Sequence, residues 1–195
     1  VLPLKTEDSA LLTMLSRREL IVPDWPAFLT EDEEEKGFEL LFDGHSLRRW
    51  RGLPAGAWTV SGGILRGGYG DPGTLQTRRA FGDLVIRFEF RLGNRGEATL
   101  ALRTDATGRG IEIALADDRW EPRHVRSSGA LAGRVVPAAD PGIGGSRWNW
   151  LTATLSGTAL TVVINDKQTL SCGLKDHPDL AALGPGPVAL RAEKG

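Results

Sequence analysis

The segment 84–92 (LVIRFEFRL) alternates apolar and charged side chains, and this pattern constrains the fold more than any other stretch. Apolar residues occupy every second position, and the positions between them include Arg87, Glu89 and Arg91. At the helical period of about 3.6 residues per turn, the apolar side chains would scatter around a cylinder. At a period of two they form one face. The segment therefore predicts a β-strand that buries one face and turns the other toward solvent or a ligand.

Short apolar alternations separated by glycine and other turn residues continue from residue 37 to the end of the chain. They predict strands at 38–42, 57–60, 64–67, 74–77, 84–92, 98–103, 110–115, 149–155, 160–164 and 187–191. Many short strands at this spacing are typical of an antiparallel sandwich or barrel. No repeat with a period of about 20 to 50 residues is evident, which disfavours propellers and solenoids. The sequence therefore predicts an all-β fold.

The first part of the chain has a different character. Residues 7–20 place apolar side chains at a partly helical spacing, with acidic residues first and arginines late, as a helix dipole favours. An acidic run follows at 31–35, and Thr30 with Glu33 fits a capping box if a helical turn forms there. We therefore expect a short helical and acidic extension before the β domain.

Length and composition limit the domain count and the partners. The 195 residues suit one substantial domain with an appendage, which we place at 37–195 and 1–36. With 24 basic and 25 acidic residues the net charge is -1, so no electrostatic footprint for nucleic acid or an anionic membrane surface is present. No apolar run approaches the roughly 18 residues of a membrane span. We expect no nucleic-acid partner and no membrane insertion.

The chain offers few residues for metal or thiol chemistry. Cys172 is the single cysteine, which excludes an internal disulfide framework and a multi-cysteine metal site. The three histidines, His45, His124 and His177, fit neither a three-His nor an HExxH pattern, so a zinc enzyme is not expected. The sequence therefore predicts no metal and no cofactor.

The alternation in two later segments adds polar side chains to the face opposite the core. In 98–103 the leucines leave Arg103 on the other face, and in 110–115 the isoleucines and leucine leave Glu112 there. If these strands are neighbours of 84–92, their charged faces meet in one outward patch, and a curved sheet makes that patch a groove. Charged groups with tryptophans nearby suit a sugar, because hydroxyls need polar partners and a pyranose ring stacks on indole.

Longer stretches match one family in order. They are GFELLFDGHSLRRW (37–50), WTVSGGILRGG (58–68), LQTRRAFGDLVIRFEFRL (75–92), GIEIALADD (110–118), SGALAGRVVP (128–137) and SRWNWLTATLSGTALTVVIND (146–166). These stretches resemble the 3-keto-disaccharide hydrolase domain family, and the combination of LFDG, the following tryptophan and FGD is specific. The resemblance covers about residues 37–191.

The resemblance implies a fold and an activity. The fold is a concanavalin A-like antiparallel jelly-roll sandwich with a carbohydrate ligand on its concave sheet. The activity is hydrolysis of a 3-keto-disaccharide or related glycoside by acid–base chemistry, in a periplasmic or extracellular location. The family also has a further strand after 187–191, so we expect this domain to lack its last strand, which leaves open a longer chain with further domains.

Several positions depart from the family's pattern. They are Glu97, Ala98 and Thr99 in place of Asn-Ser-Gly, Ala114 in place of Gln, Arg147 in place of Glu, and Asp166 in place of Gly. A second hypothesis is therefore a non-catalytic carbohydrate-binding or adhesion domain that has lost catalytic groups.

The candidate catalytic residues are Glu112, on the face opposite the core, and His124, a potential proton shuttle in the loop 117–129. The candidate substrate-binding residues are Arg103, Glu89, Arg87, Asp117 and Trp120. Structural alternatives stand beside these roles, among them an ion pair of Glu112 with Arg103 or Arg87. The two carboxylates of a glycosidase lie about 5 to 5.5 Å apart for retention or about 6.5 to 9.5 Å for inversion. The pairs to examine are Glu112 with Glu89 and Glu112 with Asp117.

Overall fold

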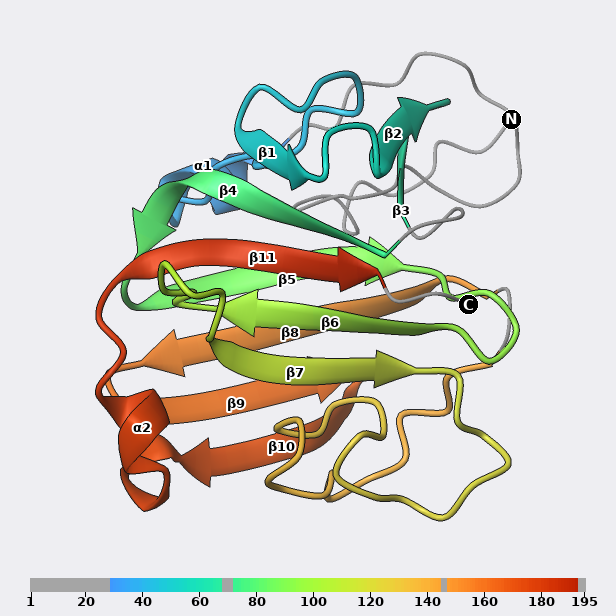
Figure 1. Ribbon diagram of the computed structural model, residues 1–195, viewed down its shortest axis with the longest axis vertical. Helices are drawn as coiled ribbons and strands as arrows, with labels where there is room; N and C mark the ends of the chain where they lie inside the picture. Colours follow the sequence, from blue (N-terminus) through green and yellow to red (C-terminus); the bar gives the residue numbers. More distant parts are fainter. Residues whose placement is uncertain (1–28, 68–71, 145–146, 193–195) are drawn as a thin grey trace.

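Two antiparallel β-sheets packed face to face form the body of the protein (Figure 1). The computed structural model describes residues 29–67, 72–144 and 147–192. One sheet has five strands in the order β1-β4-β11-β6-β7, and the other has four in the order β10-β9-β8-β5. Strands β2 and β3 pair as a separate ribbon. The predicted all-β antiparallel sandwich is confirmed.

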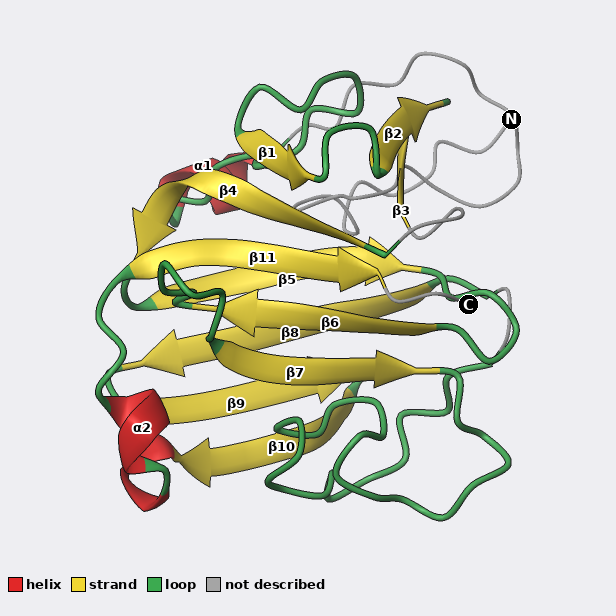
Figure 2. Ribbon diagram, viewed as in Figure 1, coloured by secondary structure: helices red, strands yellow, loops and turns green. Residues whose placement is uncertain are grey.

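The helices are short, and strands make up most of the regular structure (Figure 2). The strands of the five-stranded sheet are β1 (Trp50–Leu53), β4 (Gly73–Phe81), β6 (Glu97–Leu102), β7 (Ile111–Ala116) and β11 (Gly186–Ala192). The strands of the four-stranded sheet are β5 (Leu84–Phe90), β8 (Asn149–Ser156), β9 (Ala159–Ile164) and β10 (Lys167–Gly173). The remaining elements are β2 (Trp58–Ser61), β3 (Ile64–Gly67), α1 (Glu31–Glu35), α2 (Pro178–Ala181) and a 3₁₀ turn (Leu174–Asp176).

Most predicted strands are present, but the prediction for 38–42 is wrong. That segment has no strand; Phe42 is buried there and the Leu41 carbonyl accepts a hydrogen bond from the Trp50 indole at 2.6 Å. The sequence did not predict β1 or β10. In β10 the polar residues outnumber the apolar ones, and Leu170 is its one strand residue buried in the core cluster. Both are edge strands, which pair on one side and need fewer apolar side chains.

The acidic run at 31–35 forms the helix α1, whose capping box is confirmed. The Thr30 hydroxyl accepts a hydrogen bond from the Glu33 N–H at 3.3 Å, and the Glu33 carboxylate accepts one from the Thr30 N–H at 3.0 Å. Glu33 is buried and its other oxygen lies 3.7 Å from Arg87 on β5. The helix expected at 7–20 lies outside the described residues, and the domain boundary at 36 stays a prediction.

The core lies between the two sheets, where the inward positions of both meet. On β5, Ile86, Phe88 and Phe90 are at most 5% exposed, as their alternation predicts. The opposing sheet contributes Leu100, Leu102, Ile111, Ile113, Val188 and Leu190 to the same cluster. Each such side chain contributes about 1.5–3 kcal/mol when fully buried, so this interlayer contact holds the sandwich together.

The expectation that charges from 84–92, 98–103 and 110–115 meet in one patch is wrong. Strand β5 belongs to the four-stranded sheet, while β6 and β7 belong to the five-stranded sheet. Alternation decides which face of a strand is buried, but not which sheet the strand joins. Arg87 and Glu89 therefore lie on the opposite side of the molecule from Glu112, with the core between them.

The FGD sequence ends in Asp83, whose carboxylate connects the β4–β5 turn to the end of β6 and to the β8–β9 turn. Asp83 accepts a hydrogen bond from Arg103, at the end of β6, at 2.8 Å, and one from the Gly157 N–H, between β8 and β9, at 2.9 Å. Arg103 also donates to the Gly82 carbonyl at 3.2 Å and is only 9% exposed. This contact links an end of one sheet to the other sheet.

We expect Asp83→Ala to lower the free energy of unfolding by about 1–3 kcal/mol, because it leaves the buried Arg103 guanidinium without its carboxylate. Urea denaturation measures the change. Asp32→Ala, which removes the exposed ion pair with Lys36, is the control and should cost less than about 1 kcal/mol. Equal losses in the two variants would contradict a linking role for Asp83.

Candidate functional site

The outer face of the five-stranded sheet carries a row of residues that runs across all its strands. The register joins Glu112 on β7 to Ala101 on β6, Ala101 to Ala189 on β11, Ala189 to Gln76 on β4, and Gln76 to Arg51 on β1. With strands about 4.8 Å apart, the row spans about 19 Å. Three residues of this row are polar, and small alanines separate Glu112 from the others.

An ion pair spans this face from the central strand β11 to the edge strand β7. The Arg191 guanidinium, on β11, donates one hydrogen bond to Glu112 Oε1 and another to the Gly108 carbonyl. Arg191 and Glu112 come from strands that flank β6, so the pair crosses over Ala101, which is 0% exposed. Within the described residues Glu112 Oε2 has no hydrogen-bond partner.

The segment 103–110 folds back from β6 over the start of β11 and forms one wall of this face (Figure 1). The Thr104 N–H and hydroxyl both donate to the Pro187 carbonyl, each at 2.9 Å. Gly186 permits this approach, since a Cβ there would lie 2.4 Å from the Thr104 carbonyl oxygen. Asp105 then accepts bonds from the Thr107 and Arg109 N–H groups and fixes the turn. The wall is therefore a defined structure that presents the Gly108 carbonyl to Arg191.

Residues 127–135 pair along the outer edge of β7, on the side away from β6. The Ala114 N–H donates to the Ala130 carbonyl, and the Ala132 N–H donates to the Glu112 carbonyl at 2.8 Å. The buried Ser128 hydroxyl bonds both the N–H and the carbonyl of Ala116. The backbone of Glu112 is thus held from both sides.

Three of the predicted substrate-binding residues lie away from the sheet face that carries Glu112. Arg103 is turned toward Asp83 and away from Glu112, which rules out the proposed Glu112–Arg103 pair. Arg87 contacts the Glu33 carboxylate and stacks on the Phe38 ring at 4.7 Å. Glu89 lies opposite Trp150 in the register of β5 with β8. None of the three shares a sheet face with Glu112, and the roles assigned to them stay predictions without geometric support.

Asp117 and Trp120 come together where the chain leaves β7. Asp117 accepts two hydrogen bonds from Arg119, at 2.9 and 3.1 Å, and one from the Arg95 N–H at 3.1 Å. Burial acts to raise the pKa of Asp117, but the hydrogen bonds from Arg119 and Arg95 and the charge of Arg119 hold that pKa below its ordinary value. Trp120 is 59% exposed, with the guanidinium groups of Arg119 and Arg95 over its ring.

His124 faces its own loop. Its Nδ1 accepts a hydrogen bond from the Arg126 N–H at 3.0 Å, and its Nε2 lies 3.3 Å from the Glu121 carboxylate. These contacts favour the tautomer with the proton on Nε2. No hydrogen bond or ion pair joins His124 to Glu112 within the described residues, so a shuttle role stays untested.

No pair of the expected carboxylates has the spacing of a glycosidase. Glu89 lies on the other sheet from Glu112. Asp117 is five residues further along the chain, about 16 Å at the rise of a strand. Both separations exceed the range for retention or inversion, so neither Glu89 nor Asp117 pairs with Glu112 as a second catalytic carboxylate.

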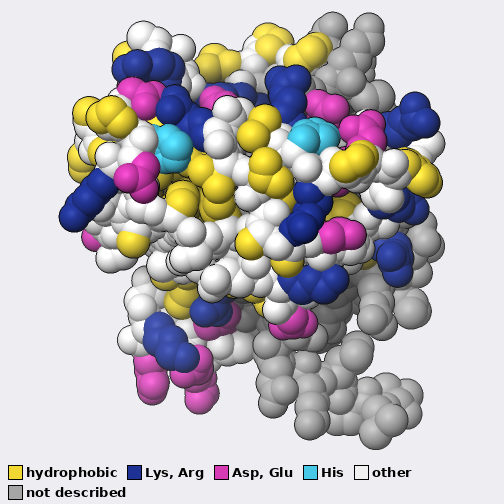
Figure 3. Space-filling view, turned by 90° about the horizontal axis from the view of Figure 1, so that it is seen from below, with side chains coloured by type: hydrophobic (Ala, Val, Ile, Leu, Met, Phe, Trp, Pro, Cys, Tyr) yellow, Lys and Arg dark blue, Asp and Glu magenta, His cyan; other side chains and the backbone are white. Residues whose placement is uncertain are grey.

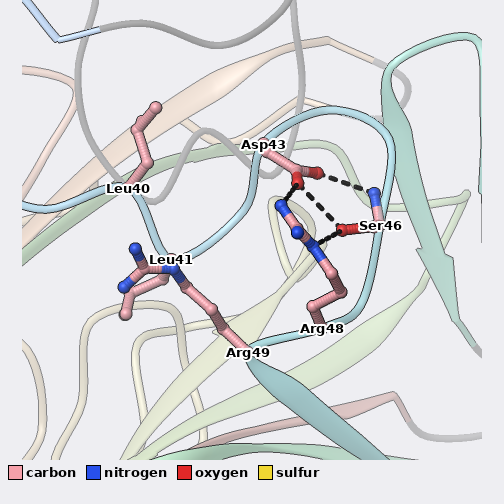
Figure 4. A pocket seen from close by; sticks show the side chains of 6 residues that line it. All are labelled: Leu40, Leu41, Asp43, Ser46, Arg48 and Arg49. Carbon is pink, nitrogen blue, oxygen red and sulfur yellow. Dashed lines mark hydrogen bonds and ion pairs between the residues drawn. The ribbon is translucent and has the colours of Figure 1, made fainter.

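The LFDG sequence forms a turn beside a cavity of about 280 Å³, lined by residues that include Asp43, Ser46 and Arg48 (Figure 4). Asp43 accepts hydrogen bonds from the His45 N–H at 2.9 Å, the Ser46 N–H at 2.6 Å and the Ser46 hydroxyl at 2.8 Å. These bonds close the turn within the chain. Together with the hydrogen bond from Trp50 to the Leu41 carbonyl, they give the LFDG motif a structural role that needs no ligand.

Sequence reasoning missed Arg191, although a signal for it was present. In 187–191, Val188 and Leu190 alternate with Ala189 and Arg191, which places Arg191 on the same side as Ala189. The pairing with Glu112 depends on the order of β11, β6 and β7, which the sequence does not state.

The described residues contain no group of three His, Cys, Asp or Glu side chains that could hold a metal ion. No helix among them is long and apolar enough to cross a membrane. On the surface around β10 and the loops after β7, basic and acidic side chains are interspersed (Figure 3).

The chain belongs to the family described as the 3-keto-alpha-glucoside-1,2-lyase-like domain, whose model matches residues 37–195. This confirms the family expected from the sequence. No curated protein matches the sequence.

Solved structures share the fold at low identity. A proposed glycosyl hydrolase from Parabacteroides distasonis superimposes with a TM-score of 0.74 at 17% identity, over 88% of this chain and 94% of that one. A second from the same organism has a TM-score of 0.68 at 18% identity, over 77% and 88%. The carbohydrate-binding module CBM66 from Bacillus subtilis has a TM-score of 0.57 at 13% identity, over 75% and 88%. The jelly-roll sandwich expected from the resemblance is confirmed.

Asp43 should make stability depend on acid pH. Its partial burial acts to raise its pKa, but the hydrogen bonds from His45 and Ser46 and the Arg48 charge lower that pKa from 3.8 to about 2. A carboxylate with a depressed folded pKa stabilises the protein above the unfolded pKa, and this contribution disappears as pH falls from about 4 to about 2. We expect Asp43→Ala to be less stable than the wild type at neutral pH, with the difference shrinking across that window in urea titrations. A constant difference would contradict this assignment.

Proposed function

We propose that this domain binds a 3-keto-glucoside on the outer face of the five-stranded sheet and cleaves it by acid–base chemistry. The observation that supports this most is the Glu112–Arg191 pair on that face, outside the core. Arg191 holds one oxygen of Glu112, and the other oxygen is available to act as a base. Membership of a family described by a 1,2-lyase activity on 3-keto-α-glucosides supports the same substrate class.

The chemistry follows from the ketone. A carbonyl at C3 of the sugar acidifies the C2–H bond, so Glu112 can take that proton while the C–H electron pair forms an enolate. The guanidinium of Arg191 would donate hydrogen bonds to the enolate oxygen, where negative charge develops. When the ketone re-forms, the electron pair makes a C1–C2 double bond, the C1–O bond breaks, and the leaving oxygen takes the proton from Glu112.

These reaction steps need only one carboxylate, in agreement with the separation of Glu112 from Asp117 and Glu89. Its products are an unsaturated keto sugar and an alcohol, and no water is consumed. Addition of water to the double bond would complete a net hydrolysis of the glycoside. The contacts of His124 point to Glu121 and Arg126, so the proposal does not use it.

The test follows proton exchange and cleavage in one experiment. Methyl 3-keto-α-glucoside is incubated with the purified chain in D₂O, and NMR records loss of the C2–H signal and release of methanol. We expect Glu112→Gln to slow both by about 10²-fold or more, because a positioned base contributes at least that factor. The control is Glu97→Gln, which removes an exposed acid from β6 on the same sheet.

The second candidate is a non-catalytic carbohydrate-binding domain. The small apolar side chains around Glu112, namely Ala101, Ala114 and Ala189, favour it, because they offer no further polar group to a reacting sugar. A wild-type protein that binds sugars on this face but exchanges no C2 proton and releases no methanol would establish this alternative and exclude the lyase chemistry.

A further inference from the structure

An exposed tryptophan lies at the end of the sandwich where the turn between β5 and β6 meets the loop that follows β7. Trp120 is 59% exposed, the largest exposed fraction among the large apolar side chains of the described residues. It occupies a turn closed by the Glu121 N–H bond to the Asp118 carbonyl at 2.9 Å. The fold does not need an indole there, because Trp120 is outside the core cluster. An exposed indole that the core does not use is suited to contact with a ligand.

The surroundings of Trp120 are fixed by one buried carboxylate. The Asp117 side chain is 0% exposed and binds Arg119 through two parallel hydrogen bonds. Arg119 in turn lies 4.4 Å from the centroid of the Trp120 ring. A bidentate carboxylate pair restricts the guanidinium plane, so the cation beside the indole is held in place.

The same carboxylate holds a second arginine beside the ring. Asp117 accepts the Arg95 N–H at 3.1 Å, in a turn where Arg95 has a φ of 54°, a conformation that few non-glycine residues adopt. The Arg95 guanidinium lies 5.9 Å from the Trp120 centroid. Asp117 neutralises Arg119, but the Arg95 guanidinium has no ion pair within the described residues.

We propose that Trp120 and Arg95 form a second saccharide-binding surface that selects sugars carrying a carboxylate. The indole would stack on the apolar face of a sugar ring, and the unpaired guanidinium would bind the carboxylate of a uronic acid unit. Asp117 is then a positioning residue that acts through the two arginines. The surface lies beyond the end of β7, whereas Glu112 is near its start, about 16 Å before Asp117 at the rise of a strand.

The inference rests on the proposed function in one respect only: both assume that the ligand is a saccharide. The lyase chemistry concerns a small keto sugar at Glu112, and the surface at Trp120 concerns an acidic unit at the other end of the strand. A substrate that is long enough could occupy both. The two can also fail separately, because they use different residues.

The probe is trigalacturonate, with its fully methyl-esterified form as the uncharged match. Titrations followed by ¹H–¹⁵N spectra record the indole N–H signals of the six tryptophans, and the Trp120 signal is assigned from the Trp120→Phe spectrum. We expect trigalacturonate to shift the Trp120 signal, and the ester to bind at least about tenfold more weakly, because it loses the charge-assisted hydrogen bond to Arg95.

Matched variants separate the two contacts. Trp120→Ala should weaken trigalacturonate binding by about fivefold or more, as loss of an anchoring tryptophan does at other interfaces. Arg95→Gln should remove the preference for the acid over its ester. Trp150→Ala, which removes an indole 38% exposed on β8 of the other sheet, and Arg78→Gln, which removes an exposed arginine on β4, should change neither result.

The proposal is wrong if trigalacturonate leaves the Trp120 signal in place, if acid and ester bind equally well, or if Trp150→Ala weakens binding as much as Trp120→Ala. Turnover of methyl 3-keto-α-glucoside is measured on the same variants. Trp120→Ala that keeps full turnover but loses trigalacturonate supports two separate surfaces. Absence of turnover together with tight binding of trigalacturonate would reject the lyase chemistry and leave this surface standing.

Discussion

The burial of two apolar sheet faces against each other is the constraint on which the rest of this structure depends. Each strand in the sandwich commits alternate residues to the interlayer core, as Ile86, Phe88 and Phe90 do on β5. The positions between them must then face outward, where side chains are free to serve a ligand. The outer face of the five-stranded sheet uses this freedom for the Glu112–Arg191 pair, and neither residue belongs to the core cluster.

The family motifs divide into those that build the sandwich and those that build its outer face. Asp43 closes a turn, Trp50 bonds the Leu41 carbonyl, and Asp83 holds Arg103 and the β8–β9 turn. These contacts account for LFDG, its tryptophan and FGD without a ligand. A strong motif can therefore report the fold alone, and the chemistry of this chain must be argued from less distinctive positions such as Glu112.

Asp117 illustrates how a buried charge can organise a surface. Its carboxylate has no exposed area, and its hydrogen bonds go to the turn before β6 and to the loop after β7. The result is that two arginines from separate loops lie close to one exposed indole. From the sequence, Asp117 was predicted to be a partner acid of Glu112 or a direct contact to the ligand. The sequence of a loop does not show whether a carboxylate in it is buried.

The fold class, the strands with clear alternation, the capping box at Thr30 and the outward placement of Glu112 could all be predicted from the sequence. They depend on local periodicity and turn chemistry. Three features became visible only in the folded chain: β5 lies in the other sheet from β6 and β7, Arg103 turns to Asp83, and Arg191 reaches Glu112 across β6. The physical reason is that alternation fixes which side of a strand is buried. Which strands become neighbours is fixed by long-range pairing and packing, which no short stretch of sequence records.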